Sequence, residues 1–567
     1  GRGRERRGGY GGAATAGRRR RGGDGGAETA GVRVADTDTA GGDVVKRAGG
    51  ARGAGGFVSA GVAADLRQAA AEEGVPLVAA DPAGEVALRF GGRVAELGEE
   101  ERRAVCERAT AGDDAIRERT AAIVQRVRRE GDAALVAMAR EFDGAELERL
   151  EVPRAEWRAA LEEVDAGLRR AMERAIANVR TVHEAFRPKA SEVESEPGVV
   201  VGRRPDPLRR VGVYAPGGRA AYPSSVIMGV VPAKVAGVEE VVLCSPPGPD
   251  GLPAAVVLAA AALAGVDRVF ALGGAGAIAA MAYGTASVPR VDRIVGPGNA
   301  YVAEAKVQVS SACAIDSPAG PSELLVIADH TADPVTVARE MVAQAEHDPM
   351  AAVVCVAVGD ETAEQVIAAL GELAPAAERA PIVRAALAAQ GGVLVAQTYD
   401  EAAAFASDYA AEHLLLAIGE PEQRMMLARL RNTGTVFLGE TSSVAYGDYM
   451  TGANHVLPTG GLARSYSGLS TLDFVRWTTY QRVSPQAAAK LAYDVARLAD
   501  AEGLPGHAAA ARAWMKVRDG GRTRLSERAF RKRLRDIAAE AGGELLETDA
   551  PDAPTDAGDG DPRETTG

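Results

Sequence analysis

Residues 211–247 read VGVYAPGGRAAYPSSVIMGVVPAKVAGVEEVVLCSPP, and this stretch decides the fold. Apolar runs over Arg210–Ala215 and Glu240–Cys244 predict two strands, and Ser224–Ala236 between them predicts a helix. Strands that are joined through a helix by short links are typical of neighbouring parallel strands in one sheet. The stretch therefore predicts a β-α-β unit of an α/β protein.

The same alternation continues along the chain. Further strands are predicted at Arg268–Leu272, Arg293–Val295, Leu324–Ala328, Ala352–Val358, Val393–Ala396, Leu414–Ala417 and Thr435–Leu438. Helical segments such as Ala254–Ala264, Pro334–Glu346 and Glu361–Leu373 fall between these strands. So many strands exceed one small sheet, and a polar, alanine-rich joint occurs in the 380s. The predicted fold class is α/β, with two Rossmann-like, incomplete parallel-sheet units.

Segments outside the strand–helix alternation are predicted to form extensions. Long amphipathic patterns before the first strand predict an N-terminal helical segment over residues 113–200. The two α/β units would then span residues 201–330 and 331–460, followed by a C-terminal helical arm over residues 461–520. The pattern assigns no fold to residues 57–112, which we treat as a further extension.

Both ends of the chain are poor in apolar residues. Residues 1–56 contain 19 glycines and the run Arg18–Arg21, while residues 521–567 combine a short extension with an acidic tail. Such compositions predict disorder. The net charge is +6 over residues 1–52 and −7 over Gly543–Gly567, which leaves −12 for the chain between them. An acidic body argues against nucleic acid as the main partner, and we favour a solvated tail over a polyanion-binding role for the arginine run.

Composition excludes several other classes of protein. The 567 residues are 47% hydrophobic, but no run of about 18 apolar residues predicts a membrane-spanning helix. The first residues lack the pattern of a secretory signal. The four cysteines, at positions 106, 244, 313 and 355, have neither disulfide-framework nor zinc-type spacing. We expect a cytoplasmic, globular protein without a membrane partner.

Glycine-rich turns follow three of the predicted strands. The segment RVFALGGAGAIA, Arg268–Ala279, matches G-x-G-x-x-A through Gly274, Gly276 and Ala279. Similar turns occur at residues 215–218 (APGG) and 296–299 (GPGN). Such turns at the carboxyl ends of parallel strands can bind the phosphates of a nucleotide. A tight turn without a ligand explains the single G-x-G-x-x-A match equally well.

Polar residues capable of acid–base or metal chemistry lie in the second half. Gln344 and His347 share one face at a helix end, where a histidine is often only a cap. Glu412 and His413 precede an apolar strand and are either an acid–base pair or an exposed polar pair. In addition, Asp448 and His455 flank the glycine-rich loop GDYMTGANHVLPTGG, and His507 lies at a predicted helix start.

Four of these side chains form a plausible zinc set. Gln344, His347, Asp448 and His507 offer nitrogen and oxygen ligands without a thiolate, which suits a catalytic ion. Their wide separation means that spacing alone does not establish the site.

Several long motifs resemble histidinol dehydrogenases. In addition to residues 211–247, they are VGPGNAYVAEAK, AIDSPAGPSELLVIAD, AQAEHDP, AAEHLLL, GANHVLPTGGLARSYSGLS and EGLPGHAAAA. They occur in unbroken order between about Asp113 and Val517. The resemblance implies a zinc-dependent enzyme of histidine biosynthesis, which oxidises L-histidinol through L-histidinal to L-histidine with two NAD.

The resemblance also implies roles for individual residues. One zinc ion per subunit would be held by Gln344, His347, Asp448 and His507, which would also contact the substrate. Glu412 and His413 match the acid–base pair of the family, and His413 contacts substrate as well. The remaining matches are substrate contacts at Ser322, His455 and Glu502, and NAD contacts at Tyr214 and Asn299.

Three further expectations follow from the resemblance. Gly276 stands where the family usually has glutamine, which predicts weaker or differently oriented NAD binding. The arm that carries Glu502 and His507 would reach into a partner subunit, so that a homodimer shares its active sites. The alternative function is a related zinc- and NAD-dependent dehydrogenase of another polar alcohol, such as a sulfonated diol. The presence of Glu502 and His507 favours histidinol over this alternative.

Overall fold

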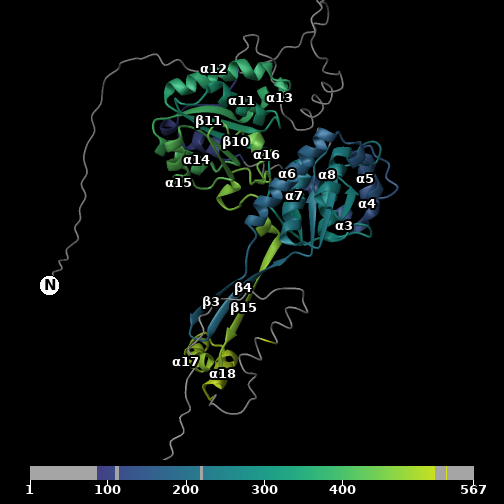
Figure 1. The fold of residues 1–567 in the computed structure, drawn as a ribbon, viewed down its shortest axis with the longest axis vertical. Helices are drawn as coiled ribbons and strands as arrows, with labels where there is room; N and C mark the ends of the chain where they lie inside the picture. Colours follow the sequence, from purple (N-terminus) through teal and green to yellow (C-terminus); the bar gives the residue numbers. More distant parts are fainter. Residues whose placement is uncertain (1–85, 109–113, 218–220, 517–531, 533–567) are drawn as a thin grey trace, which may run out of the picture. The chain divides into compact units, whose positions relative to one another are not determined.

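The computed structural model describes residues 86–108, 114–217, 221–516 and 532, which form three sheets (Figure 1). The predicted N-terminal tail, most of the 57–112 extension and, apart from residue 532, the 521–567 segment lie outside the described residues. Residue 218, the last residue of the predicted glycine turn at 215–218, also lies outside them.

The first sheet has six strands in the order β2-β7-β6-β5-β8-β9. In that order the strands are Glu151–Val152, Arg268–Ala271, Glu240–Ser245, Arg210–Tyr214, Arg293–Val295 and Ala314–Ile315. β5 and β6 pair in parallel, with Val211 opposite Val241, which confirms the β-α-β unit predicted from residues 211–247. Only the pair of β2 and β7 is antiparallel in this sheet.

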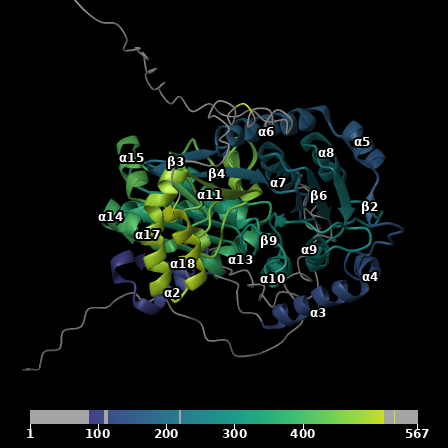
Figure 2. The same cartoon turned by 90° about the horizontal axis from the view of Figure 1, so that it is seen from below.

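Helices cover both faces of the first sheet, as Figure 2 shows. They are α3 (Asp114–Glu130), α4 (Asp132–Phe142), α5 (Arg154–Glu163), α6 (Ala166–Ala185), α7 (Pro223–Ala236), α8 (Ala255–Ala264), α9 (Gly274–Tyr283) and α10 (Ala300–Val309). Alternate side chains of β6 point to opposite faces. Val241 and Leu243 pack in the core beneath α5 to α8, whereas Val242 and Cys244 pack with α3, α4, α9 and α10.

The second sheet also has six strands, in the order β1-β12-β11-β10-β13-β14, and all its pairs are parallel. In that order the strands are Phe90–Arg93, Gly391–Ala396, Ala352–Val358, Glu323–Ala328, His413–Ala417 and Thr435–Leu438. β1 belongs to the extension to which the sequence assigned no fold. The boundary that we placed at residue 330 falls after β10, a strand of this second sheet.

Helices also cover both faces of the second sheet, and alternate side chains of its strands pack against opposite sets of helices. They are α2 (Glu99–Cys106), α11 (Pro334–Ala345), α12 (Asp360–Ala376), α13 (Ala380–Gln390), α14 (Tyr399–Tyr409), α15 (Glu420–Arg429) and α16 (Val444–Tyr449), with a short 3-10 helix, η1 (Val94–Glu96). On β10, Leu324 and Val326 pack with α11, α12 and α13, whereas Leu325 and Ile327 pack with α2, α14 and α15.

The third sheet is antiparallel and was not predicted. Its order is β15-β4-β3, with strands Val475–Val483, Val199–Pro207 and Ser191–Glu196. After β15 the chain forms α17 (Pro485–Ala501), α18 (Pro505–Arg512) and the 3-10 helix η4 (Ala513–Lys516), which form the predicted C-terminal helices. The 3-10 helices η2 (Leu462–Arg464) and η3 (Thr471–Phe474) precede β15. Every residue of β3, SEVESE, is exposed, so the strand lacks the apolar alternation by which strands are recognised.

The predicted fold class is therefore confirmed: two α/β units with parallel sheets, accompanied by helices before and after them. None of the helices in the described ranges is sufficiently long and apolar to cross a bilayer.

His183 gives the fold a testable sensitivity to acid. It is 3% exposed on the buried face of α6, and neither ring nitrogen has a hydrogen-bond partner in the described chain. Burial lowers its pKa to about 4, so the unfolded state, where the pKa is ordinary, binds the proton better. Stability is thus lost as pH falls from about 6.5 towards 4, by about 2 kcal/mol at pH 5.

Urea unfolding at pH 7 and pH 5 measures this contribution. We expect His183→Met to lose less stability than the parent chain between the two pH values, because methionine fills the space without titrating. Equal losses for the two proteins would contradict the assignment.

Candidate active site

A carboxylate and an imidazole lie together where β13 begins. Helix α14 ends at Tyr409, and Ala410 turns the chain with a left-handed φ of 53°. Glu412 follows, and His413 is the first residue of β13, between β10 and β14. Glu412 and His413 are 5% and 4% exposed. The interpretation of these residues as an exposed polar pair is therefore wrong.

The backbone of Glu323 binds both members of the pair. Its amide donates to Glu412 Oε2 at 2.7 Å, and its carbonyl oxygen lies 2.9 Å from His413 Nδ1. A carbonyl oxygen can only accept, so Nδ1 carries a proton. His413 Nε2 lies 3.5 Å from Asp448 Oδ1 and has no hydrogen-bond partner among the described residues. This nitrogen is free to exchange a proton with a ligand.

The electrostatics of the pair reflect burial and close charges. Burial raises the pKa of Glu412 above its ordinary value, although His413 and the Glu323 amide act in the opposite direction. Burial alone would lower the pKa of His413, but the carboxylates of Glu412 and Asp448 raise it well above the ordinary value. Proton-exchanging groups with such perturbed pKa values are typical of catalytic sites.

Asp448, on α16, connects His413 to two further predicted residues. Its backbone oxygen lies 2.8 Å from His455 Nδ1. Burial would raise the pKa of Asp448, but His413, His455 and His347 together lower it. Burial lowers the pKa of His347, against the charge of Asp448. Thus Asp448, His347, His413 and His455 form one electrostatic cluster.

The residues on this part of the chain suit a metal ion, of which Zn²⁺ is the predicted one. The lowered pKa values keep Asp448 ionised and His347 neutral, which are the forms that bind metals. The Gln344 side chain is 3% exposed in the last turn of α11, three residues before His347. Within the described ranges, no three His, Cys, Asp or Glu side chains are grouped closely enough to hold a metal by themselves.

The polar loop after α16 is fixed at several points. Asn454 Nδ2 donates to the Met228 carbonyl on α7 at 2.8 Å, and Asn178 Nδ2 donates to the Met450 carbonyl at 2.7 Å. Further along, the amide of Gly320 donates to Thr459 Oγ1 at 2.5 Å. These bonds hold His455 beside Asp448. They also fix residues 320–322, of which Ser322 is half-buried directly before β10.

The predicted NAD contacts lie at the carboxyl ends of the first sheet's strands. Tyr214 ends β5, is buried, and accepts a hydrogen bond from the Gly274 amide at the start of α9 at 3.0 Å. Gly296 follows β8 with φ of 116°, and a side chain there would collide with the Tyr214 carbonyl. Asn299 caps α10 by accepting from the Val302 amide at 3.1 Å. Two glycine turns therefore meet at Tyr214.

Gly276 lies inside α9 rather than in the turn itself. A Cβ at this position would lie 3.1 Å from Met138 Sδ and 3.5 Å from Leu135 Cδ2, both on α4. A glutamine side chain would thus leave the helix against α4, and Met138 would have to shift to admit it.

Glu502 and His507 lie apart from the cluster in sequence and in the contacts of the described chain. Glu502 caps α17, His507 is in the first turn of α18, and both are exposed. Their helices pack on each other through Ala496, Ala499 and Ala508. No interaction in the described part of the chain connects either residue to Asp448 or His347. The structure brings His347 into electrostatic contact with Asp448, and Gln344 lies one helical turn before His347, but His507 is not connected to them in the described chain.

Sequence reasoning missed the buried ion pairs that support both regions. Lys306 Nζ pairs with Asp316 and donates to the Gly296 carbonyl at 3.1 Å, while the Gly296 amide donates to Asp316 Oδ2 at 2.8 Å. Arg108 pairs with Glu323 behind the acid–base groups. The only sequence signal for these buried ion pairs was a charged residue directly beside an apolar run, as with Glu323 at the start of ELLVIA.

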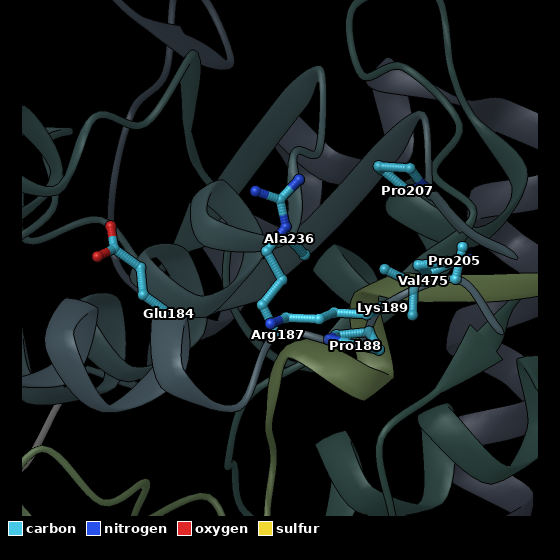
Figure 3. Close-up of a pocket in the computed structure, with 9 residues that line it drawn as sticks. Glu184, Arg187, Pro188, Lys189, Pro205, Pro207, Ala236 and Val475 are labelled. Atoms are coloured by element: carbon cyan, nitrogen blue, oxygen red, sulfur yellow. The ribbon is translucent and has the colours of Figure 1, made fainter. Parts of the chain in front are cut away.

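A cavity of about 390 Å³ lies elsewhere, where α6, α7, β4 and β15 meet (Figure 3). Arg187, Lys189, Pro205 and Val475 are among its lining residues. None of the predicted site residues lines it, so the cavity is not the predicted active site.

Parallel α/β sheets with glycine turns at strand ends suit a dinucleotide, and a buried carboxylate–imidazole pair suits proton exchange, a combination typical of dehydrogenases. The family model of histidinol dehydrogenase matches residues 106–515. The chain belongs to the histidinol dehydrogenase family.

Individual relatives agree with the family match. A histidinol dehydrogenase from Haloarcula marismortui is 49% identical over 420 residues, which cover 74% of this chain and 98% of the relative. One from Methanosarcina barkeri is 42% identical and covers 74% and 96%, respectively. The crystal structure of histidinol dehydrogenase from Elizabethkingia anophelis has a TM-score of 0.72 at 32% identity, covering 76% of this chain and 98% of that one. These relatives support histidinol dehydrogenase over the dehydrogenase of another polar alcohol.

Proposed function

We propose that this enzyme oxidises L-histidinol through L-histidinal to L-histidine with two NAD, in the cytoplasm. The observation that carries the proposal is the buried pair Glu412–His413, in which His413 Nε2 lies 3.5 Å from Asp448 Oδ1 without a hydrogen-bond partner in the described chain. Two successive oxidations need a base for the alcohol proton and a base for the water that adds to the aldehyde. The pair offers one of each.

His413 acts first in this proposal. In the neutral form of the ring, Nδ1–H stays bonded to the Glu323 carbonyl and Nε2 receives the hydroxyl proton as hydride leaves the alcohol carbon. The carboxylates of Glu412 and Asp448, which raise the pKa of His413, stabilise the imidazolium that this transfer forms. Glu412 then removes a proton from the water that attacks the aldehyde. Its raised pKa makes it a stronger base than an ordinary carboxylate. NAD supplies the hydride-accepting chemistry, and the protein supplies orientation.

Substrate would be held by Ser322, His455 and Glu502, by His413, and by the residues that hold zinc: Gln344, His347, Asp448 and His507. Zinc supplies Lewis-acid charge that orients and polarises the substrate. The protonation states of His347 and Asp448 and the buried amide of Gln344 support this assignment.

NAD would bind at the glycine turns around Tyr214 and Asn299. Support comes from the hydrogen bond between Tyr214 and the start of α9 and from the close approach of Gly296. Backbone amides at helix starts are suited to the negative charge of a dinucleotide.

We also propose that the enzyme is a homodimer in which the C-terminal arm completes the partner's site. Glu502 and His507 are exposed on an arm whose α17 and η4 also expose apolar side chains, among them Leu498 at 68% and Trp514 at 48%. Exposed apolar side chains gathered on one small helical segment are typical of an interface. A partner subunit would bury them and receive His507 as its fourth zinc ligand.

Metal removal tests the proposal. We expect purified enzyme to contain one zinc ion per subunit and to lose L-histidinol oxidation after dialysis against a chelator, with recovery on adding Zn²⁺. Full activity in metal-free protein would contradict the ligand assignment.

Gly276 makes a separate prediction about NAD. Gly276→Gln should lower the Kd for NAD about fivefold through an added amide hydrogen bond, once Met138 on α4 has shifted to admit the longer side chain. Gly276→Ala is the control, because it places the same Cβ against Met138 without an amide. Equilibrium titration with NAD measures both variants. Equal Kd values for Gly276→Gln and the parent enzyme would contradict the expectation that Gly276 weakens binding.

A further inference from the structure

Arg108 and Glu323 form an ion pair that is almost fully shielded from solvent. Their side chains are 3% and 2% exposed, and the guanidinium donates to both carboxylate oxygens, with Nε–Oε1 at 3.1 Å and Nη2–Oε2 at 2.8 Å. The bidentate geometry fixes the orientation of both groups. Neither residue is among the predicted ligands, bases or cofactor contacts.

Glu323 connects this ion pair directly to the acid–base groups. Its amide and carbonyl bind Glu412 and His413, respectively, as described above. Its carboxylate also accepts a hydrogen bond from the Gly460 amide at 2.6 Å. One residue thus fixes both proton-exchanging side chains and the end of the loop that carries His455.

Arg108 fixes the other side of the same region. Beyond Glu323, it donates to the carbonyls of Tyr409, Val105 and Cys106, and its guanidinium lies 3.5 Å from the centre of the Tyr409 ring. Tyr409 ends α14 three residues before Glu412. Arg108 therefore holds both chain segments that lead into the pair: Glu323 on β10 and Tyr409 before β13.

We propose that Arg108 and Glu323 are positioning residues for the acid–base pair: their buried ion pair holds Glu412 and His413 in the geometry that both oxidations require. The inference rests on the acid–base roles proposed above. Burying two charges is costly, and an apolar pair would fill such a space with less loss of solvation. A bidentate pair instead fixes direction, and small displacements of catalytic groups lower rates strongly.

Arg108→Lys tests the proposal, since it keeps the charge but not the two-pronged contact. We expect kcat per folded, zinc-loaded subunit to fall 10- to 100-fold for both L-histidinol and L-histidinal, by the general effect of misplaced catalytic groups. KM for L-histidinol should change less than kcat, because most of the proposed substrate contacts do not touch the ion pair, and zinc content should change less than about twofold, because no proposed metal ligand contacts Arg108 or Glu323 in the described chain. Arg102→Lys is the matched control, because Arg102 pairs with Asp408 on the surface of the same segment.

Glu323→Asp is the second variant, which retains the charge but shortens its reach, and it supports the proposal if it lowers kcat in the same way. A lower melting temperature with unchanged kcat per folded subunit in either variant would show a purely structural role and overturn the proposal. So would a loss confined to one of the two oxidations. His413→Asn and Glu412→Gln, measured in the same assays, separate failure of the positioning proposal from failure of the proposed function. If these two variants remain fully active, the acid–base roles themselves are wrong.

Discussion

Replacing His413 by asparagine is expected to lower kcat for L-histidinol by about a thousandfold, the order of magnitude for loss of a general base. Asparagine can still donate to the Glu323 carbonyl, so the local fold should survive. What it lacks is the nitrogen Nε2, which in His413 lies 3.5 Å from Asp448 Oδ1 and has no hydrogen-bond partner in the described chain. Initial rates of NADH formation at saturating substrate measure the effect.

His330→Asn is a suitable control, because His330 is exposed and has no proposed role. Its rate should equal that of the parent enzyme. Glu412→Gln should differ from both: the first oxidation continues, while L-histidinal accumulates because water is no longer activated. A His413→Asn variant within threefold of the parent rate would remove His413 from the mechanism.

Mixing two inactive variants is expected to restore activity to about a quarter of the parent level, given random exchange between subunits of a symmetric dimer. Asp448→Asn removes a proposed zinc ligand from the α/β body of a subunit, whereas His507→Ala removes the proposed ligand on its C-terminal arm. In a mixed dimer, one site combines the unchanged body of one subunit with the unchanged arm of the other. The second site contains both substitutions. Half of the randomly formed dimers are mixed, and each contains one working site.

The measurement is the NADH rate after the two proteins are unfolded and refolded together. Each variant refolded alone is the control and should remain inactive. No recovery in the mixture, with dimers shown to form, would mean that His507 serves the site of its own subunit or none.

Much of the fold was predictable because buried parallel strands consist of short runs of apolar residues in the sequence. In 211–247 the pattern predicted β5, α7 and β6 almost to the residue. The exposed strand β3 and the short strand β1 lacked that signal, because SEVESE and FGGR bury little apolar surface. The position of β1 depends on pairing with β12, which is distant in sequence, and that of β3 on an antiparallel pairing with the next strand, β4.

The residue types of the site were predictable from the sequence, but the residues that hold them in position were not. Glu412 and His413 are adjacent, so their pairing was readable. The links from Asp448 to His413 and His347 arise only when α16 meets the amino end of β13 and the residues that follow α11. The partnership of Arg108 with Glu323 spans 215 positions, and no local pattern marks it. Glycine turns were expected at carboxyl ends of strands, whereas the acid–base pair lies at the opposite, amino end of its strand.

The central claim is that one acid–base pair carries out two successive oxidations of the same substrate. The most direct test incubates the zinc-loaded enzyme with limiting L-histidinol and excess NAD, then quantifies NADH and L-histidine at completion. The account predicts two NADH for each L-histidine, with no aldehyde left in solution. One NADH per substrate with L-histidinal as the end product, or no NADH at all, would contradict it.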